Sequence, residues 1–227
     1  METLEFDGSL YEGGGQILRV GVSLAIIKRI PVRIYNIRAN RPKPGLANSH
    51  MTAMKLACEL CNGQIEGNQL GSSRIHLVPN TLCRGAFSGD CGTAGSVTLM
   101  LQALLPPVVR SYCSEYSQQA TTLVLKGGTD VGFSPPSHFA SEVLRPFLSR
   151  MGVNFDYQVD QRGFYPRGGG QVTVRVHPVE AVSGVELLDQ GGSLDFRAQI
   201  DFSPTRRRIK GGISDHDYIS RVLKALK

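Results

Sequence analysis

The sequence predicts an α+β protein with α/β-type repeats, in which two copies of one β-α-β-α-β-β unit share a core. Strand-like and helix-like patterns follow one another in the same order in both copies. Ser49-His50 and Ser137-His138 each begin the second helix of a copy, and a glycine ends each of these helices. Each copy has roughly 80 to 90 residues, and its two helices would cover one apolar face of its sheet.

The first copy follows from hydrophobic periodicity. Alternating apolar and polar side chains predict its strands, and nearly continuous apolar runs predict its helices. The expected elements lie at 4–7, 17–26, 31–38, 48–63, 64–66 and 74–78. Asn48 and Ser49 are both good caps for the second helix, and Gly63 ends it.

The second copy has the same signals. An apolar helix opens at 93–96, and Pro106-Pro107 should stop it because proline lacks a backbone N–H. The remaining expected elements are a strand at 121–126, a helix at 137–152, and paired strands at 155–160 and 171–176.

The pattern changes after residue 183. Residues 185–188 and 194–202 read as strands, and a last amphipathic helix holds Ile219, Val222 and Leu226. These elements cannot bury their own apolar faces. We therefore expect three parts, 1–82, 83–180 and 181–227, the last apparently cut inside a domain.

The composition agrees with a packed core. Of the 227 residues, 41% are apolar and 19% charged. The net charge of +6 leans towards a polyanionic partner, although many proteins of moderate positive charge bind none. Tryptophan is absent and aromatic residues are 7%, so contacts with nucleic acid should depend more on charge than on stacking.

Neither a membrane segment nor a disulfide framework is expected. The sequence shows no basic-then-apolar leader and no apolar run of membrane length. The five cysteines have no regular spacing and suit a reducing compartment. Cys58 and Cys61 form a C-x-x-C inside a helical pattern, where buried structural thiols are favoured over a zinc or redox site.

The stretch DGSLYEGGGQILR, residues 7–19, is the first candidate site. A strand, a glycine turn and a helix start can turn backbone N–H groups towards an anion. Arg19, one turn into the helix, could add a bidentate grip on a phosphate. The stretch matches neither common phosphate-loop pattern, and a simple tight turn is the alternative. The loop at 38–46 offers a second basic cluster, in which two prolines stiffen the chain around Arg41.

Several motifs together resemble the RNA 3′-terminal phosphate cyclase family. They are EGGGQILR at 12–19, RPKPGL at 41–46, TAGSVTLMLQ at 93–102, KGGTDVGFSP at 126–135 and RGFYPRGGGQV at 162–172. The resemblance runs from about residue 4 to 180. It implies repeated β-α-β-α-β-β units with a smaller inserted α/β domain, whose beginning would be 181–227.

The resemblance implies an ATP-dependent ligase reaction assisted by a divalent metal (Mg or Mn), on an RNA with a 3′-phosphate end. A histidine takes AMP from ATP, the AMP passes to the RNA 3′-phosphate, and the neighbouring 2′-hydroxyl expels it to give a 2′,3′-cyclic phosphodiester. The adenylate is needed because a phosphate dianion repels an oxygen nucleophile and oxide is a poor leaving group.

The resemblance also assigns residues. Catalytic positions are Glu12, Arg19, Arg38 and Arg41; the ATP site is Gln102 and Pro135; Glu12 orients an arginine or holds the metal. Where the family often has glutamine before the histidine, this chain has Ser49. The alternatives are structural: Arg38 as a solvated strand end, Gln102 as a polar spot on a buried helix, Pro135 as a turn residue. The glycines at 168–170 read as a hairpin flanked by Arg162 and Arg167, which could touch RNA backbone.

The adenylylated histidine of the family would lie in a further repeat beyond residue 227, so we expect this chain to be inactive as it stands. For His50 and His138, capping or packing is favoured over catalysis. His76 and His177 fall on strands that look half-exposed. His216 stands between two aspartates but outside the matched motifs.

We expect a nuclear location for the protein, with a cytoplasmic one beside it. Three hypotheses follow for its function. The first is a shortened cyclase-family chain. The second is a non-catalytic cyclase-like RNA-binding or ribosome-biogenesis factor, although this chain keeps the arginine pattern. The third is another enzyme of similar repeats, such as an enolpyruvyl transferase, against which the RGFYPRGGGQV stretch argues.

Overall fold

A computed structural model describes residues 2–114 and 117–188 of the chain. Residues up to Glu186 form one domain, which contains two four-stranded sheets with helices between their strands. We call the two predicted copies within it the first and second units. The predicted α+β class is therefore confirmed. No helix among the described residues is long and apolar enough to cross a membrane.

The first sheet belongs to the first predicted copy. Its elements are β1 (Leu4–Asp7), α1 (Gln16–Lys28), β2 (Val32–Tyr35), α2 (Asn48–Leu60), β3 (Gln64–Glu66) and β4 (Ile75–Val78). The strands lie in the order β1-β2-β4-β3, with β1 and β2 parallel and the other pairs antiparallel.

The second sheet repeats this topology. Its elements are β5 (Ala86–Asp90), α3 (Val97–Ser114), β6 (Thr121–Gly127), α4 (Ser137–Phe139), a π-helical turn (Ala140–Leu144), α5 (Arg145–Arg150), β7 (Phe155–Gln161) and β8 (Gly170–Val176). The order β5-β6-β8-β7 again places one parallel pair beside two antiparallel pairs. The repeated β-α-β-α-β-β order predicted from the sequence is thus observed.

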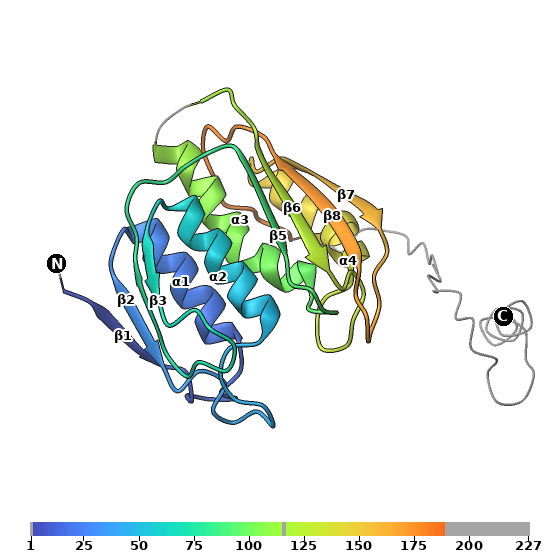
Figure 1. The fold of residues 1–227 in the computed structure, drawn as a ribbon. Helices are drawn as coiled ribbons and strands as arrows, with labels where there is room; N and C mark the ends of the chain where they lie inside the picture. Colours follow the sequence, from blue (N-terminus) through green and yellow to red (C-terminus); the bar gives the residue numbers. More distant parts are fainter. Residues whose placement is uncertain (1, 115–116, 189–227) are drawn as a thin grey trace, which may run out of the picture. The chain divides into compact units, whose positions relative to one another are not determined.

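The two sheets share one hydrophobic core. Helices α1, α2 and α3 lie between them, and α3 packs against both α1 and α2 (Figure 1). Leu18 on α1, Met54 on α2 and Leu104 on α3 are buried in the same cluster as Leu125 and Val174 of the second sheet. Helix α3 of the second unit is therefore the element that joins the two copies.

The prediction that Pro106-Pro107 stops the third helix is wrong. Helix α3 continues through both prolines to Ser114. Each proline removes a helical hydrogen bond. However, Leu104 and Leu105 before the prolines, and Val108 after them, are all buried. Burial of one continuous apolar face on both sides of the prolines outweighs the lost hydrogen bonds.

Two strands differ from the sequence-based prediction. The sequence pattern does not predict strand β5, because AFSGD carries only one large apolar side chain and its residues alternate between exposed and half-buried. Strand β2 ends at Tyr35 rather than at residue 38, because Asn36 and Arg38 have φ values of +53° and +55°. This left-handed backbone is incompatible with an extended strand.

The helix at 137–152 and the tail also differ in detail. The helix contains a π turn and ends at Arg150, and residues 185–188 form no strand. The predicted strand at 194–202, the last helix and His216 lie outside the described residues.

The shared core predicts cooperative unfolding. Replacing Leu104, fully buried on α3, with alanine should lower the free energy of unfolding by about 2–5 kcal/mol. Leu24→Ala is the control, because 52% of that side chain is exposed. Urea titrations followed by circular dichroism and tyrosine fluorescence should give one coincident transition for residues of both sheets. Two separate transitions would show that the units do not share a core.

Candidate functional site

The loops after β1 and β2 form one edge of the first sheet. Because β1 and β2 are parallel neighbours, the loop at 8–15 and the loop at 36–47 leave the sheet at the same end. The Gly8 N–H donates to the carbonyl of Tyr35 (2.7 Å), and the Asn40 amide donates to the carbonyl of Ser9 (3.1 Å). The two motifs EGGGQILR and RPKPGL are therefore held together.

Arg41 and Glu12 make the ionic contact between these loops. Arg41 Nη2 lies 3.3 Å from Glu12 Oε1, and both side chains are substantially exposed. A Cβ built at Gly14 would lie 2.5 Å from that oxygen and 2.8 Å from Arg41 Nη2. The ends of these two side chains therefore occupy the space beside the Gly14 backbone, and a larger residue would have to displace them.

Arg19 connects the site to the second unit. Its Nε donates a hydrogen bond of 2.9 Å to Gln102 Oε1 on α3. Arg19 and Gln102 are 83 residues apart in the chain, and α1 and α3 pack against each other. The structure thus brings together a predicted catalytic residue and a predicted ATP-site residue.

Arg38 is fixed in an uncommon backbone conformation. Its φ is +55°, and its Nη1 donates to the carbonyl of Gly45 at 2.7 Å. The Arg41 N–H also donates to the carbonyl of Arg38 at 3.0 Å. Left-handed backbone at a non-glycine residue costs on the order of 1 kcal/mol and occurs most often where a loop is held for function. The alternative of a freely solvated strand end does not describe this side chain.

The three arginines form a positive cluster with little internal compensation. We call Arg19, Arg38 and Arg41, with Glu12, the arginine cluster. Burial lowers the pKa of Arg19, and the Glu12 carboxylate partly opposes that shift. Burial, and then repulsion from Arg41, lowers the pKa of Arg38. In the described part of the chain, no carboxylate is ion-paired with Arg19 or Arg38. All three guanidinium groups stay charged at neutral pH.

His50 belongs to this site and was not assigned to it from the sequence. Its Nδ1 accepts the Ala47 N–H at 3.2 Å, so the predicted capping role is confirmed. In the neutral ring, Nε2 then carries the proton. A Cβ at Gly15 would lie 2.9 Å from Arg19 Nη1 and 3.2 Å from Cδ2 of His50. The structure thus adds a neutral N–H donor to the arginine cluster.

Pro135 reaches the same region through α3. Its carbonyl accepts a hydrogen bond of 2.7 Å from Thr98 Oγ1, and Thr98 lies one helical turn before Gln102. The loop at 128–136 is therefore tied to the same helix that binds Arg19. Ser49, where the family often has glutamine, packs against Gly95 at the start of this helix.

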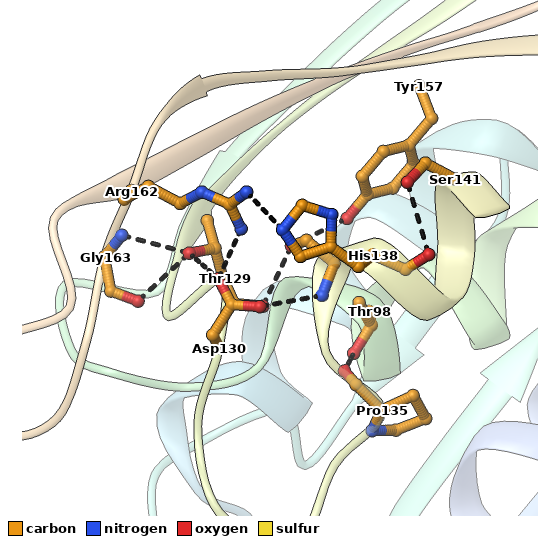
Figure 2. Close-up of polar contacts among 10 residues, drawn as sticks. Thr98, Thr129, Asp130, Pro135, His138, Ser141, Tyr157, Arg162 and Gly163 are labelled. Atoms are coloured by element: carbon orange, nitrogen blue, oxygen red, sulfur yellow. Dashed lines mark hydrogen bonds and ion pairs between the residues drawn. The ribbon is translucent and has the colours of Figure 1, made fainter. Parts of the chain in front are cut away.

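The second unit has a polar network at the corresponding place, after its second strand (Figure 2). Arg162 Nη1 lies 2.8 Å from Asp130 Oδ2, and its Nη2 lies 2.7 Å from Nε2 of His138. The other Asp130 oxygen accepts the Ser137 N–H at 3.0 Å. Arg162, predicted to touch RNA backbone, thus binds a carboxylate of its own chain.

The other candidate metal ligands are the histidine, cysteine and acidic side chains. Among the described residues, no group of three or more of them could hold a metal ion. All five cysteines are free thiols. Burial raises the pKa of Cys58, and that of Cys61 to about 11, so both are weak nucleophiles, as a structural role predicts. His76 on β4 lies 3.9 Å from Glu66, whereas His177 lies just after β8 rather than on a strand and is 2.9 Å from Asp156.

Fold and site together define a class: a repeated α+β protein with a cluster of arginines beside the contact between α1 and α3. Comparison with known proteins gives the family. A family model described as RNA 3′-terminal phosphate cyclase matches residues 10–218. The chain belongs to the RNA 3′-terminal phosphate cyclase family.

Individual relatives agree with this assignment. A protein named RNA 3′-terminal phosphate cyclase from Methanopyrus kandleri is 41% identical over 191 residues, which cover 84% of this chain and 53% of the relative. The proteins of that name from Hyperthermus butylicus and Archaeoglobus fulgidus are 45% and 44% identical, over 50% and 56% of their lengths. The chain spans about half the length of the curated relatives that it matches.

The electrostatics of the site predict the titration of His50. Burial first, and then repulsion from Arg38 and Arg19, lowers the pKa of His50 to about 4. An NMR titration should give a midpoint near this value in the folded protein and near about 6.5 in urea. Inorganic phosphate bound to the arginines should raise the folded midpoint, because it weakens the repulsion.

The same shift predicts a pH dependence of stability. Since the folded pKa lies below the unfolded one, the unfolded chain binds more protons between them. The contribution of neutral His50 is therefore complete above about pH 6.5 and is lost as the pH falls towards 4. His50→Gln should reduce the loss of unfolding free energy between pH 7 and 4.5 by about 2 kcal/mol. Equal acid dependence in both proteins would contradict the assigned shift.

Proposed function

We propose that this chain acts in the ATP-dependent conversion of an RNA 3′-phosphate into a 2′,3′-cyclic phosphodiester, with AMP and diphosphate as the other products. In this proposal the arginine cluster binds the terminal phosphate of the RNA. The observation that carries it is the convergence of three charged guanidinium groups on one sheet edge, where Glu12 is the carboxylate that pairs with the cluster among the described residues.

The cluster is suited to a phosphate monoester by charge and by geometry. A terminal phosphate carries a charge of about −1.5 to −2 at neutral pH. Arg19 and Arg38 each use one nitrogen for a hydrogen bond to an uncharged oxygen, which orients the guanidinium without neutralising it. Charge-assisted hydrogen bonds from two or three arginines would then stabilise both the bound phosphate and charge that develops at phosphorus.

The start of helix α1 adds to this site. Gly15 is its N-cap, and no side chain caps the first backbone N–H groups. These groups carry the positive end of the helix dipole. The neutral His50 supplies a further donor at Nε2. A phosphate oxygen bound here would therefore meet donors from both the backbone and side chains.

ATP and a divalent ion enter this proposal as follows. Gln102 and Pro135 would line the nucleotide site, because Gln102 binds Arg19 and Pro135 is bonded to Thr98, one turn earlier on the same helix. Glu12 is a single carboxylate, so it fits a metal ion only as one ligand among phosphate and water oxygens, a common arrangement for Mg²⁺. A bound ion would supply charge neutralisation at the phosphates.

The second unit provides an internal comparison. Arg162, in the β7–β8 hairpin, pairs with Asp130 at 2.8 Å. In the first unit, Arg41 pairs with Glu12 at 3.3 Å, whereas the partner of Arg19 is Gln102, an uncharged amide. The first unit thus has more arginines than paired carboxylates among the described residues. This difference supports placing the RNA phosphate at the first unit.

Binding of RNA ends tests the proposal. Arg41→Ala should weaken binding of a 3′-phosphorylated RNA about tenfold or more, because it removes a charge-assisted hydrogen bond. The same RNA with a 3′-hydroxyl should be affected much less. Fluorescence anisotropy at two salt concentrations measures both. Arg33→Ala is the matched control, since Arg33 on β2 is also exposed but pairs with Glu5 of β1 at 2.6 Å.

Equal losses for the two RNAs would reduce Arg41 to a general backbone contact. Binding that ignores the 3′-phosphate in the wild-type chain would instead favour the non-catalytic RNA-binding alternative. Both results would remove the basis for the cyclase assignment at this site.

Binding by wild type and by a Glu12 variant, each with and without Mg²⁺, tests the role of Glu12. In EDTA, Glu12→Gln should bind 3′-phosphorylated RNA about two- to fivefold tighter than wild type, because a repelling carboxylate is lost. Added Mg²⁺ should tighten wild-type binding and leave the variant almost unchanged. If both proteins gain equally from Mg²⁺, Glu12 does not contact the ion. Glu5→Gln, a change on the neighbouring strand, controls for net charge.

A further inference from the structure

The loops around the arginine cluster carry the most exposed aromatic rings of the described residues. Relative exposures are 97% for Tyr11, 109% for Phe133 and 81% for Tyr165. The other aromatic side chains among the exposed large apolar residues are at most 43% exposed. Tyr11 precedes Glu12, Phe133 lies two residues before Pro135, and Tyr165 stands in the β7–β8 hairpin. We call Tyr11, Phe133 and Tyr165 the aromatic rim.

The two loops of the second unit that carry the rim are fastened to each other. Thr129 and Gly163 exchange backbone and side-chain hydrogen bonds of 2.8–3.2 Å, and Arg162 pairs with Asp130 (Figure 2). The hairpin is closed by the Gly168 N–H, which donates to the carbonyl of Phe164 at 2.8 Å. The rings are therefore exposed on anchored backbone.

A series of close contacts connects these loops to the arginine cluster. Gly168 packs on the backbone of Thr93, and Gly95 packs on Ser49, the neighbour of His50. Thr98 binds the carbonyl of Pro135 and begins the turn that ends at Gln102. The hairpin, the loop at 128–136 and the cluster thus surround the beginning of α3.

Backbone strain supports a role for two of the rings outside the core. Tyr11 and Phe133 have φ values of +55° and +61°, in the left-handed region that bulky residues avoid. Neither ring gains burial in return for this conformation. Both rings are therefore held exposed to solvent, and Tyr11 directly precedes Glu12 of the arginine cluster.

We propose that the aromatic rim stacks the bases of the single-stranded nucleotides that precede the terminal RNA phosphate. Base stacking on an aromatic ring is tolerant of sequence and pairs commonly with cationic contacts to the backbone. Arg167, exposed beside Tyr165 on the same hairpin, supplies such a cation. The inference rests on the proposed function, since it places the phosphate in the arginine cluster.

Length dependence of binding tests the inference. The double variant Phe133→Ser/Tyr165→Ser should bind a 3′-phosphorylated RNA decamer about tenfold more weakly than wild type. A nucleoside 3′-phosphate, which has no preceding bases, should bind both proteins equally. Tyr165→Phe should retain wild-type affinity, because the ring is kept. Phe147→Ser, a change at a 43% exposed ring on α5, is the matched control.

RNA with abasic sites at the positions before the 3′ end separates stacking from backbone contact. Wild type should bind it as weakly as the double variant binds the normal decamer, and the double variant should lose nothing more. Unchanged decamer affinity in the double variant would overturn the inference and leave the phosphate site intact. If wild type bound 3′-phosphorylated and 3′-hydroxyl RNA equally well, that result would instead contradict the proposed function.

Discussion

The hydrogen bond from Arg19 to Gln102 is the interaction on which the site depends. It spans the two units, and it exists because α1 and α3 pack in the shared core. Its acceptor is an amide, so it fixes the guanidinium without cancelling its charge. A partly buried cation that is ion-paired with no carboxylate among the described residues is costly. Under the proposed function, an incoming phosphate would relieve that cost, so the packing that stabilises the fold would also prepare the site.

The two units show how one topology can carry opposite electrostatics. Both place a histidine at the start of the second helix and an arginine nearby. In the second unit Asp130 pairs with Arg162, and the network fixes the loop that holds Pro135. In the first unit Arg41 repels Arg38, and burial, followed by repulsion from Arg38 and Arg19, lowers the pKa of His50. The network of the second copy supports its loops, whereas the proposed function assigns phosphate binding to the first copy.

Hydrophobic periodicity was enough to predict the repeat and most elements, because burial on one face leaves a period in the sequence. It failed where tertiary contacts override local signals. Strand β5 is defined by pairing with β6 rather than by apolar residues, and α3 passes two prolines because both sides of them are buried. Motifs indicated Glu12 and the three arginines, but the contact of His50 with Gly15 joins distant segments and leaves no local pattern.

The glycines at 13–15 show why a prediction made from the local glycine-rich pattern alone was incomplete. In a phosphate-binding loop, glycines let the backbone wrap the anion. Here a Cβ at Gly14 would meet the ends of Glu12 and Arg41, and one at Gly15 would meet Arg19 and His50. The missing side chains therefore make room for four functional side chains rather than for the ligand alone. Gly13, at φ +57°, turns the chain so that this can happen. The turn thus gives room to the side chains packed around it, and under the proposed function these side chains would contact the phosphate.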